Sequence, residues 1–176
     1  MRDGRVDDRA AFLHALDASL ASDPATVGVV RIDLDRFSRI GETFGPAVAR
    51  TVGAVIQSRM QAVAGSPDRL LEYGNDSYVA IVSLADVAPE TLESTGMDIV
   101  DLVSSPIDIA GERIAVGSNA GIAAAVHFPE PEALRLLAAA ELAIQRADAL
   151  GSRRVMVYEV TPRHDPTRLP RLFADM

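Results

Sequence analysis

Apolar positions recur along the chain at two spacings, one typical of helices and one typical of strands. Between Phe12 and Leu20 they fall three or four residues apart, which predicts a helix that Asp7 or Asp8 caps. Residues 27–34 are instead a short run rich in β-branched side chains, as in a buried strand. The chain is therefore expected to begin with a helix followed by a strand.

Further helices and strand pairs are predicted along the rest of the chain. Two of the strand pairs have turn-forming residues between them, which is typical of hairpins. In order, we expect a helix over about 48–64, strands over 70–73 and 78–84, a helix from about 89, strands over 106–109 and 114–125, a helix from 131 that Gly151 ends, and a strand over 155–160.

This order of elements predicts an α/β fold of the α+β kind. Helices that alternate with pairs of strands favour a mixed central β-sheet flanked by helices. A chain of 176 residues suits one domain with one core, which we place at residues 1–160. Residues 161–176 contain three prolines and are interpreted as a tail or linker. We expect this tail to be docked by Leu169, Leu172 and Phe173.

Composition excludes several classes of function. A formal net charge of −8 and scattered arginines argue against nucleic-acid binding, because a phosphate backbone would be repelled. No stretch approaches the roughly 18 consecutive apolar residues of a membrane span, so we expect no membrane contact by this chain. The absence of cysteine excludes disulfides and thiolate metal sites, and agrees with the cytoplasmic location that we expect.

Two acidic turns carry the main candidate chemistry. Residues 33–37 read Asp-Leu-Asp-Arg-Phe and follow a predicted strand, while residues 74–78 read Gly-Asn-Asp-Ser-Tyr and join two others. If the strands are neighbours, Asp33 and Asp76 converge on one divalent ion, for which Mg²⁺ prefers carboxylate oxygens. Backbone N–H groups of residues 34–37 are then placed to cradle phosphates. For Asp33, Asp35 or Asp76 taken alone, the sequence favours a simple turn or cap role, because aspartate is common in turns.

The two turns belong to a longer ordered series of short motifs. The series is Asp8-Arg9-Ala10-Ala11-Phe12, then residues 33–37, Phe44-Gly45, residues 73–78, residues 119–123 and residues 143–147. Over about residues 7–160 it resembles the GGDEF domain of diguanylate cyclases. The resemblance implies the palm-like fold of nucleotidyl cyclases, which has a ferredoxin-like core. It also implies a chemistry in which two facing domains join two GTP molecules into cyclic di-GMP.

The resemblance assigns a role to each turn. It implies that Asp33, the Leu34 carbonyl and Asp76 are the positions that hold Mg²⁺ or Mn²⁺, with Asp33 and Asp76 as vestigial catalytic carboxylates. It also implies a set of nucleotide-binding positions along the two turns and the helix that follows the first. These positions are Asp35, Arg36, Phe37, Ser38, Gly41, Arg50, Gly74 and Asn75.

Most of these nucleotide positions depart from the family pattern. Asn75 replaces a signature glycine, and Ser77 replaces an acidic residue. Gly41 and Arg50 stand where the family reads guanine with Asn and Asp. Glycine has no side chain to bond, and arginine has donors but no acceptor for the guanine N–H edge. The resemblance therefore predicts that guanine specificity is lost or rerouted.

The phosphate positions and the product-inhibition site are also substituted. Ser38 replaces a lysine, and Asp148 and Ser152 replace the Lys and Arg that clamp the triphosphate. A carboxylate at 148 repels phosphate, and losing several charge-assisted contacts of about 1.5–3 kcal/mol each weakens GTP binding strongly. At the product-inhibition site Asp68 is present, but Gly65 replaces the arginine. Feedback binding of cyclic di-GMP is not expected there.

Three functions remain open from the sequence, and whether the protein is an enzyme is one of the open points. The favoured hypothesis is a degenerate, non-catalytic GGDEF domain that acts as a regulatory or interaction module in cyclic di-GMP signalling. It would bind GTP or cyclic di-GMP weakly, contact a protein partner or adjoining domain, and form a homodimer. The alternative is an active diguanylate cyclase with a divergent guanine pocket, since Asp33 and Asp76 are both present. A third is an unrelated ferredoxin-like binding domain.

Overall fold

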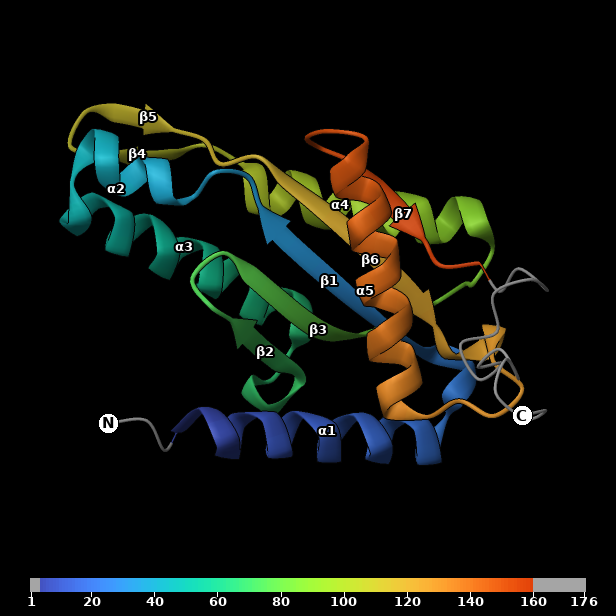
Figure 1. The fold of residues 1–176 in the computed structure, drawn as a ribbon. Helices are drawn as coiled ribbons and strands as arrows, with labels where there is room; N and C mark the ends of the chain where they lie inside the picture. Colours follow the sequence, from blue (N-terminus) through green and yellow to red (C-terminus); the bar gives the residue numbers. More distant parts are fainter. Residues whose placement is uncertain (1–3, 160–176) are drawn as a thin grey trace, which may run out of the picture.

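Five strands form one mixed sheet, with helices on both of its faces (Figure 1). The structure is a computed structural model that describes residues 4–159. The strand order is β2-β3-β1-β6-β7, in which only β7 runs parallel to its neighbour. The strands of this sheet are β1 (Val27–Leu34), β2 (Leu70–Tyr73), β3 (Ser77–Ser83), β6 (Ser118–Ala124) and β7 (Val155–Val157).

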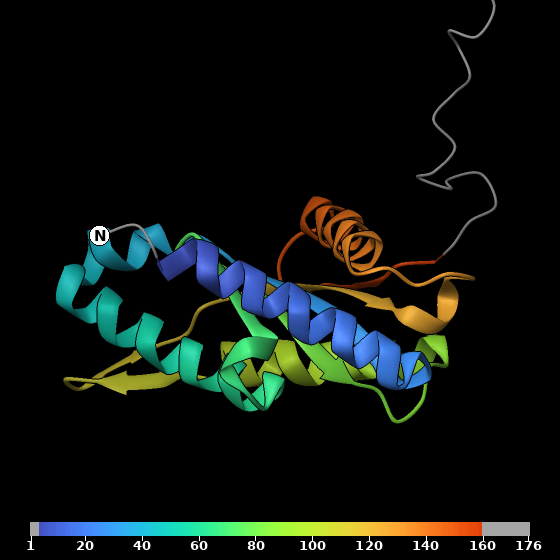
Figure 2. The ribbon, with the colours of Figure 1, turned by 90° about the horizontal axis from the view of Figure 1, so that it is seen from below.

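The helices form two layers, one on each side of the sheet (Figure 2). One layer contains α1 (Gly4–Ser22) and α5 (Ala133–Ala149). The other contains α2 (Ser38–Phe44), α3 (Pro46–Ala64) and α4 (Pro89–Ser104). The expected mixed sheet flanked by helices is therefore confirmed. Short 3₁₀ turns over Pro24–Thr26, Pro67–Arg69 and Ala125–His127 complete the described chain.

Alternation along β1 explains why the fold has two cores. Val30 and Ile32 are fully buried in the core beneath α3 and α4, whereas Val29 is fully buried in the core beneath α1 and α5. Successive side chains of a strand point to opposite faces, so Arg31 and Asp33 share the face of Val29. The apolar row on that face thus ends in two charged side chains, which begin the site described below.

The expected single strand over residues 114–125 is wrong. The segment is divided into β5 (Glu112–Ile114), which pairs with β4 (Ile107–Ile109) in a separate hairpin, and β6, which joins the main sheet. The break lies at Gly117, whose carbonyl oxygen accepts a hydrogen bond of 2.8 Å from the Asp35 N–H. The chain leaves the β4–β5 hairpin there because this contact with the end of β1 fixes where β6 begins.

Two further boundaries differ from the expectations. The last strand is shorter than residues 155–160, and α2 forms a separate helix between the first acidic turn and α3. The proposed tail at 161–176, with its docking residues Leu169, Leu172 and Phe173, lies outside the described residues. Within residues 4–159, no helix is both long and apolar enough to cross a bilayer.

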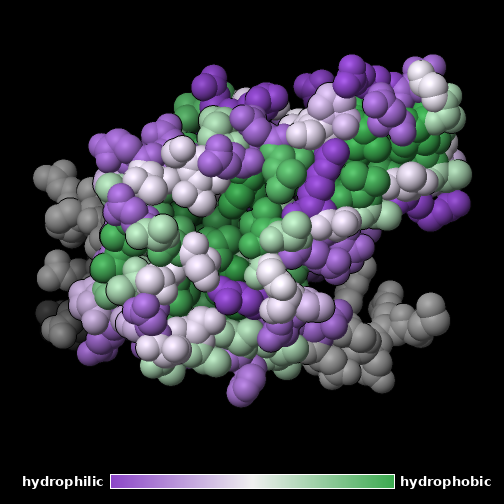
Figure 3. Space-filling model, turned by 180° about the vertical axis from the view of Figure 1, so that it is seen from behind, coloured by the Kyte–Doolittle hydropathy of each residue, from purple (hydrophilic) through white to green (hydrophobic). Residues whose placement is uncertain are grey.

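The face of the molecule covered by α3 and α4 has an apolar hollow near its centre (Figure 3). The groove there has a volume of about 490 Å³, and its apolar lining includes Val63, Val82, Ile99 and Leu102. Leu102 is 41% exposed, because α3 and α4 do not close over the sheet at this point.

Helix α5 packs on β6 at very short range. A Cβ atom added to Gly121 would lie 2.4 Å from the Ile144 backbone nitrogen and 2.6 Å from the Ala140 carbonyl oxygen. The helix face turned to the sheet is correspondingly built from small side chains, including the buried Ala139 and Ala143. Because these contacts are between backbones, neither element can move aside by changing a rotamer.

We predict that Gly121→Ala destabilises the protein by about 1–3 kcal/mol, because the added methyl group must push α5 away from β6. Gly41→Ala in α2 is the matched control, since its Cβ would meet only the Ala49 Cβ at 3.7 Å. In a helix this control should stabilise by about 0.5–1 kcal/mol. Urea unfolding followed by circular dichroism measures both, and equal effects would contradict the packing described here.

Candidate functional site

Polar side chains form one row across four neighbouring strands. In the sheet register Tyr73 lies opposite Ser77, Ser77 lies opposite Asp33, and Asp33 lies opposite Asn119. Directly opposed residues of antiparallel strands place their side chains on the same face, about 4.5–5.5 Å apart between Cβ atoms. The row therefore collects a phenol, a hydroxyl, a carboxylate and an amide from parts of the chain far apart in sequence.

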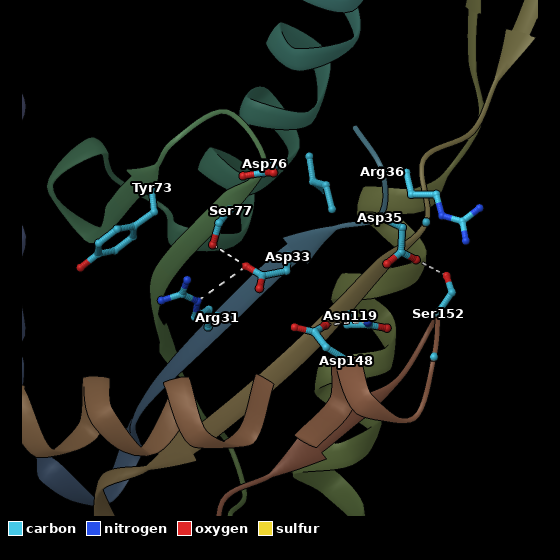
Figure 4. A pocket seen from close by; sticks show the side chains of 13 residues that line it. Arg31, Asp33, Asp35, Arg36, Tyr73, Asp76, Ser77, Asn119, Asp148 and Ser152 are labelled. Carbon is cyan, nitrogen blue, oxygen red and sulfur yellow. Dashed lines mark hydrogen bonds and ion pairs between the residues drawn. The ribbon is translucent and has the colours of Figure 1, made fainter. Parts of the chain in front are cut away.

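An open cavity of about 800 Å³ lies over this row (Figure 4). Its lining comes from β1 and the turn after it, the β2–β3 hairpin, the start of β6 and the segment that ends α5. Of the residues that the sequence nominated as metal or nucleotide ligands, the cavity brings together Asp33, Leu34, Asp35, Arg36 and Asp76. The two acidic turns thus meet at one site.

The backbone fixes how the two turns meet. The Leu34 N–H donates a hydrogen bond of 2.7 Å to the carbonyl oxygen of Asp76, so the turn after β1 is tied to the β2–β3 hairpin. Asp76 itself is exposed at the tip of this hairpin. Asp33 and Asp76 offer hard oxygen donors of the kind that Mg²⁺ and Mn²⁺ prefer. No cluster of three or more acidic or histidine side chains suited to a metal is found within residues 4–159.

Asp33 already has two partners within the protein. The Ser77 hydroxyl donates a hydrogen bond of 2.5 Å to Asp33 Oδ1, and the Arg31 Nε lies 3.6 Å from the same oxygen. Both contacts are drawn as dashed lines in Figure 4. Oδ1 of Asp33 therefore faces a hydroxyl donor and a guanidinium of the same protein.

Arg31 is held in place by residues of three other elements. Its guanidinium forms an ion pair with Glu141 of α5 and lies 5.3 Å from the centre of the Tyr73 ring on β2. The Tyr73 hydroxyl in turn accepts a hydrogen bond of 3.3 Å from Arg9 of α1. Sequence reasoning gave Arg31 no role. The available signal was a charged residue inside an apolar run, two positions before Asp33.

The far side of the cavity is acidic. Asn119 Nδ2 donates a hydrogen bond of 2.8 Å to Asp148 Oδ1, while Asn119 Oδ1 accepts one of 2.8 Å from the Arg154 N–H. Partial burial raises the pKa of Asp148, and the nearby carboxylates of Asp33 and Asp35 raise it further, while the Asn119 hydrogen bond opposes them. Burial is the largest of these causes, and the two carboxylates act in the same direction as burial.

The remaining aspartate of the first turn is also engaged. Ser152, which follows α5, donates a hydrogen bond to Asp35 Oδ2. Arg36 has a positive φ of 50° and is exposed at the cavity edge. Each of the carboxylates Asp33, Asp35 and Asp148 therefore accepts a hydrogen bond from a neutral side chain of this protein.

The other nominated nucleotide positions do not line this cavity. Phe37 packs partly buried against the core beneath α3, and Ser38 is the exposed first residue of α2. Arg50 is exposed on α3, and Gly74 holds a φ of 67° in the hairpin turn. Gly41 on α2 and Asn75 in the turn also lie outside the lining.

The aromatic position of the second turn belongs to the core. Tyr78 is 1% exposed, and burial raises its pKa to about 12, with smaller contributions from Glu72 and Asp76. Its ring packs in the core beneath α3 and α4, on the face opposite the cavity. Tyr78 is therefore a packing residue that anchors β3 beside the site.

Comparisons with known proteins agree on one family. The model of the diguanylate cyclase GGDEF domain matches residues 4–154. The GGDEF domain of DgcB from Caulobacter crescentus in complex with c-di-GMP is 24% identical, with a TM-score of 0.70 over 86% of this chain and 88% of that chain. The active GGEEF domain of a diguanylate cyclase from Vibrio cholerae is 19% identical, with a TM-score of 0.68 over 89% of this chain and 97% of that chain.

A third solved structure extends the comparison to a complex. Diguanylate cyclase SiaD from Pseudomonas aeruginosa, solved with its activator SiaC, is 16% identical, with a TM-score of 0.66 over 85% of this chain and 57% of that chain. No curated protein matches the sequence. Since the family model covers most of the chain, the protein belongs to the diguanylate cyclase GGDEF domain family.

Proposed function

We propose that this protein is a degenerate GGDEF domain without cyclase activity, which acts as a regulatory or interaction module in cyclic di-GMP signalling. The main support for the proposal is that carboxylates of the cavity are already bonded to other residues of this protein. Asp33 is hydrogen-bonded to Ser77 and paired with Arg31, and Asp148 lines the same cavity, at a position where the resemblance implies a cation. Phosphoryl-transfer catalysis depends on positioned positive charge, and here those positions are neutral or negative.

The phosphate end of the cavity supports this proposal most directly. By family resemblance, Asp148 and Ser152 occupy the positions of the triphosphate clamp, and both line the cavity. Asp148 adds negative charge, and the Ser152 hydroxyl is bonded to Asp35. A triphosphate would therefore meet a row of carboxylates with Arg31 already paired to Asp33 and Glu141. Binding should be weak.

The guanine end and the product-inhibition site support the same interpretation. Gly41 and Arg50, which stand at the guanine-reading positions, offer no side-chain acceptor to the N–H edge of the base. At the product-inhibition site, Asp68 accepts a hydrogen bond from Ser66, and Arg69 donates one of 3.5 Å to Ser83. Asp68 and Arg69 are thus each hydrogen-bonded to a serine of this protein and do not form an Arg–Asp pair that could bind cyclic di-GMP.

A metal ion, where bound, would be held by Asp33, Asp76 and the Leu34 carbonyl oxygen. The donor types suit Mg²⁺ or Mn²⁺. The ion would neutralise negative charge on a phosphate group and help to ionise the attacking hydroxyl. This chain's own residues work against that role, because Ser77 and Arg31 stabilise Asp33 without a metal.

The partners that we propose follow from the solved relatives. One of them is a complex with c-di-GMP and another is a cyclase with its activator protein. For this chain we propose a protein partner or an adjoining signalling domain as the main contact, with weak binding of GTP or cyclic di-GMP and homodimer formation as secondary properties. Contacts of this kind use the surface of the folded domain and do not require turnover.

The alternative function is an active diguanylate cyclase with a divergent guanine pocket. One observation favours it, namely that Asp33 and Asp76 line the same cavity, where the Leu34 N–H of the first turn is bonded to the Asp76 carbonyl oxygen. Both carboxylates that the resemblance assigns to metal binding are therefore present. The two functions differ in whether the remaining groups can position GTP.

We predict that the purified protein, incubated with GTP and either Mg²⁺ or Mn²⁺, forms no more cyclic di-GMP than its Asp76→Ala variant. The reason is that the groups which position the triphosphate are replaced. Chromatography of the products measures turnover, with the active Vibrio cholerae domain as the positive control. Product formation that disappears in Asp76→Ala would establish the alternative function.

A second prediction concerns the charge at position 148. Asp148→Lys should tighten GTP binding by at least about tenfold, since it replaces repulsion by one charge-assisted contact of about 1.5–3 kcal/mol. Asp108→Lys on the exposed β4–β5 hairpin makes the same change in net charge away from the cavity. Calorimetry measures the GTP affinity of the two variants. An equal gain in affinity would show that the net charge of the protein, and not the charge at position 148, controls GTP binding.

A further inference from the structure

Arg31 and Asp33 form a charge pair that is built into a single strand. Residues two apart on β1 share a face, and the Arg31 Nε lies 3.6 Å from Asp33 Oδ1. The two side chains are only 20% and 30% exposed. Because water reaches them poorly, their attraction is screened less than that of a surface pair.

The guanidinium cannot easily leave this position. Glu141 of α5 pairs with its Nη1, the Tyr73 ring of β2 lies 5.3 Å from its central carbon, and Arg9 of α1 is bonded to the Tyr73 hydroxyl. These contacts all lie on the face of the sheet that α1 and α5 cover, and together they restrict the rotamers of a long side chain. Arg31 is therefore positioned by the fold before any ligand arrives.

We propose that Arg31 is a resident counter-ion of Asp33, which takes the electrostatic role of a divalent ion at this carboxylate and thereby weakens metal binding. The proposal rests on the proposed function, whose metal ligands are Asp33, the Leu34 carbonyl and Asp76. An arginine keeps its charge at every ordinary pH. A divalent ion that approaches Asp33 must therefore break the pair or accept a like charge close by.

Ser77, like Arg31, makes Asp33 a weaker ligand for a metal ion. Its hydroxyl donates to the same Oδ1 atom of Asp33 that faces the guanidinium. One carboxylate oxygen thus has a neutral donor and a cationic partner, so a metal gains less by binding to it. Both contacts therefore converge on one oxygen atom of Asp33 at the end of β1.

The test is a titration of the full chain with Mn²⁺ alone, in which electron paramagnetic resonance measures the free ion. In the double variant Arg31→Met, Glu141→Gln, one positive and one negative charge are removed, so the net charge is that of the wild type. We expect Mn²⁺ to bind at least about tenfold more tightly than to the wild type, which corresponds to about 1.4 kcal/mol. Adding Asp33→Asn should abolish this gain.

The matched control is the double variant Arg113→Met, Asp108→Asn on the exposed β4–β5 hairpin, which also removes one positive and one negative charge but keeps the contacts of Arg31 with Asp33 and Glu141. Its Mn²⁺ affinity should stay within about twofold of the wild type. Thermal unfolding by circular dichroism verifies that each variant is folded.

Three results would overturn the proposal. These are an equal gain in both double variants, a wild type that already binds Mn²⁺ as tightly as the Arg31 variant, and a gain that survives Asp33→Asn. None of these measurements involves GTP. Cyclic di-GMP formation by the wild type in the turnover assay would refute the proposed function. The counter-ion proposal is tested separately, by the Mn²⁺ affinities measured without nucleotide.

Discussion

The pairing of β1 with β3 on one side and β6 on the other is the constraint on which the site depends. This double register places Ser77, Asp33 and Asn119 side by side, although they lie on three separate strands. A shift of one residue would turn Asp33 to the opposite face and move Ile32 out of its core. The apolar pattern of β1 thus fixes the register, and the register fixes the polar row.

The close packing of α5 on β6 sets the second wall of the cavity. Gly121 allows the helix backbone to touch the sheet, and that contact determines how near Asp148 comes to Asn119. Glu141 reaches Arg31 from the same helix. One helix therefore supplies both the Asp148 carboxylate, which lines the cavity, and the Glu141 carboxylate, which holds the guanidinium. Asp148 adds to the negative charge that Asp33, Asp35 and Asp76 bring to the cavity.

The two cores explain how the scaffold persists while the polar row changes. Tyr78, Ile32 and Val30 belong to the core beneath α3 and α4, and the row lies on the opposite face at the end of the strands. Side chains such as Ser77 and Asp148 set the polarity and charge at the cavity and lie outside both apolar cores. The fold can therefore be stable with different charges at the cavity, because different side chains form the cores and line the cavity.

The sequence by itself determined the elements and the two acidic turns, because apolar periodicity and turn residues act over a few neighbouring positions. The strand over 27–34, the hairpin at 74–76 and the helix over 133–149 all follow from such local signals. Only the tertiary structure decided where β5 ends and β6 begins, since a contact between Gly117 and Asp35 sets that break. The tertiary structure also decided that Arg31 lies between Asp33, Glu141 and Tyr73. The partners of a charged side chain depend on strand register and helix packing, and no local sequence pattern encodes either of these.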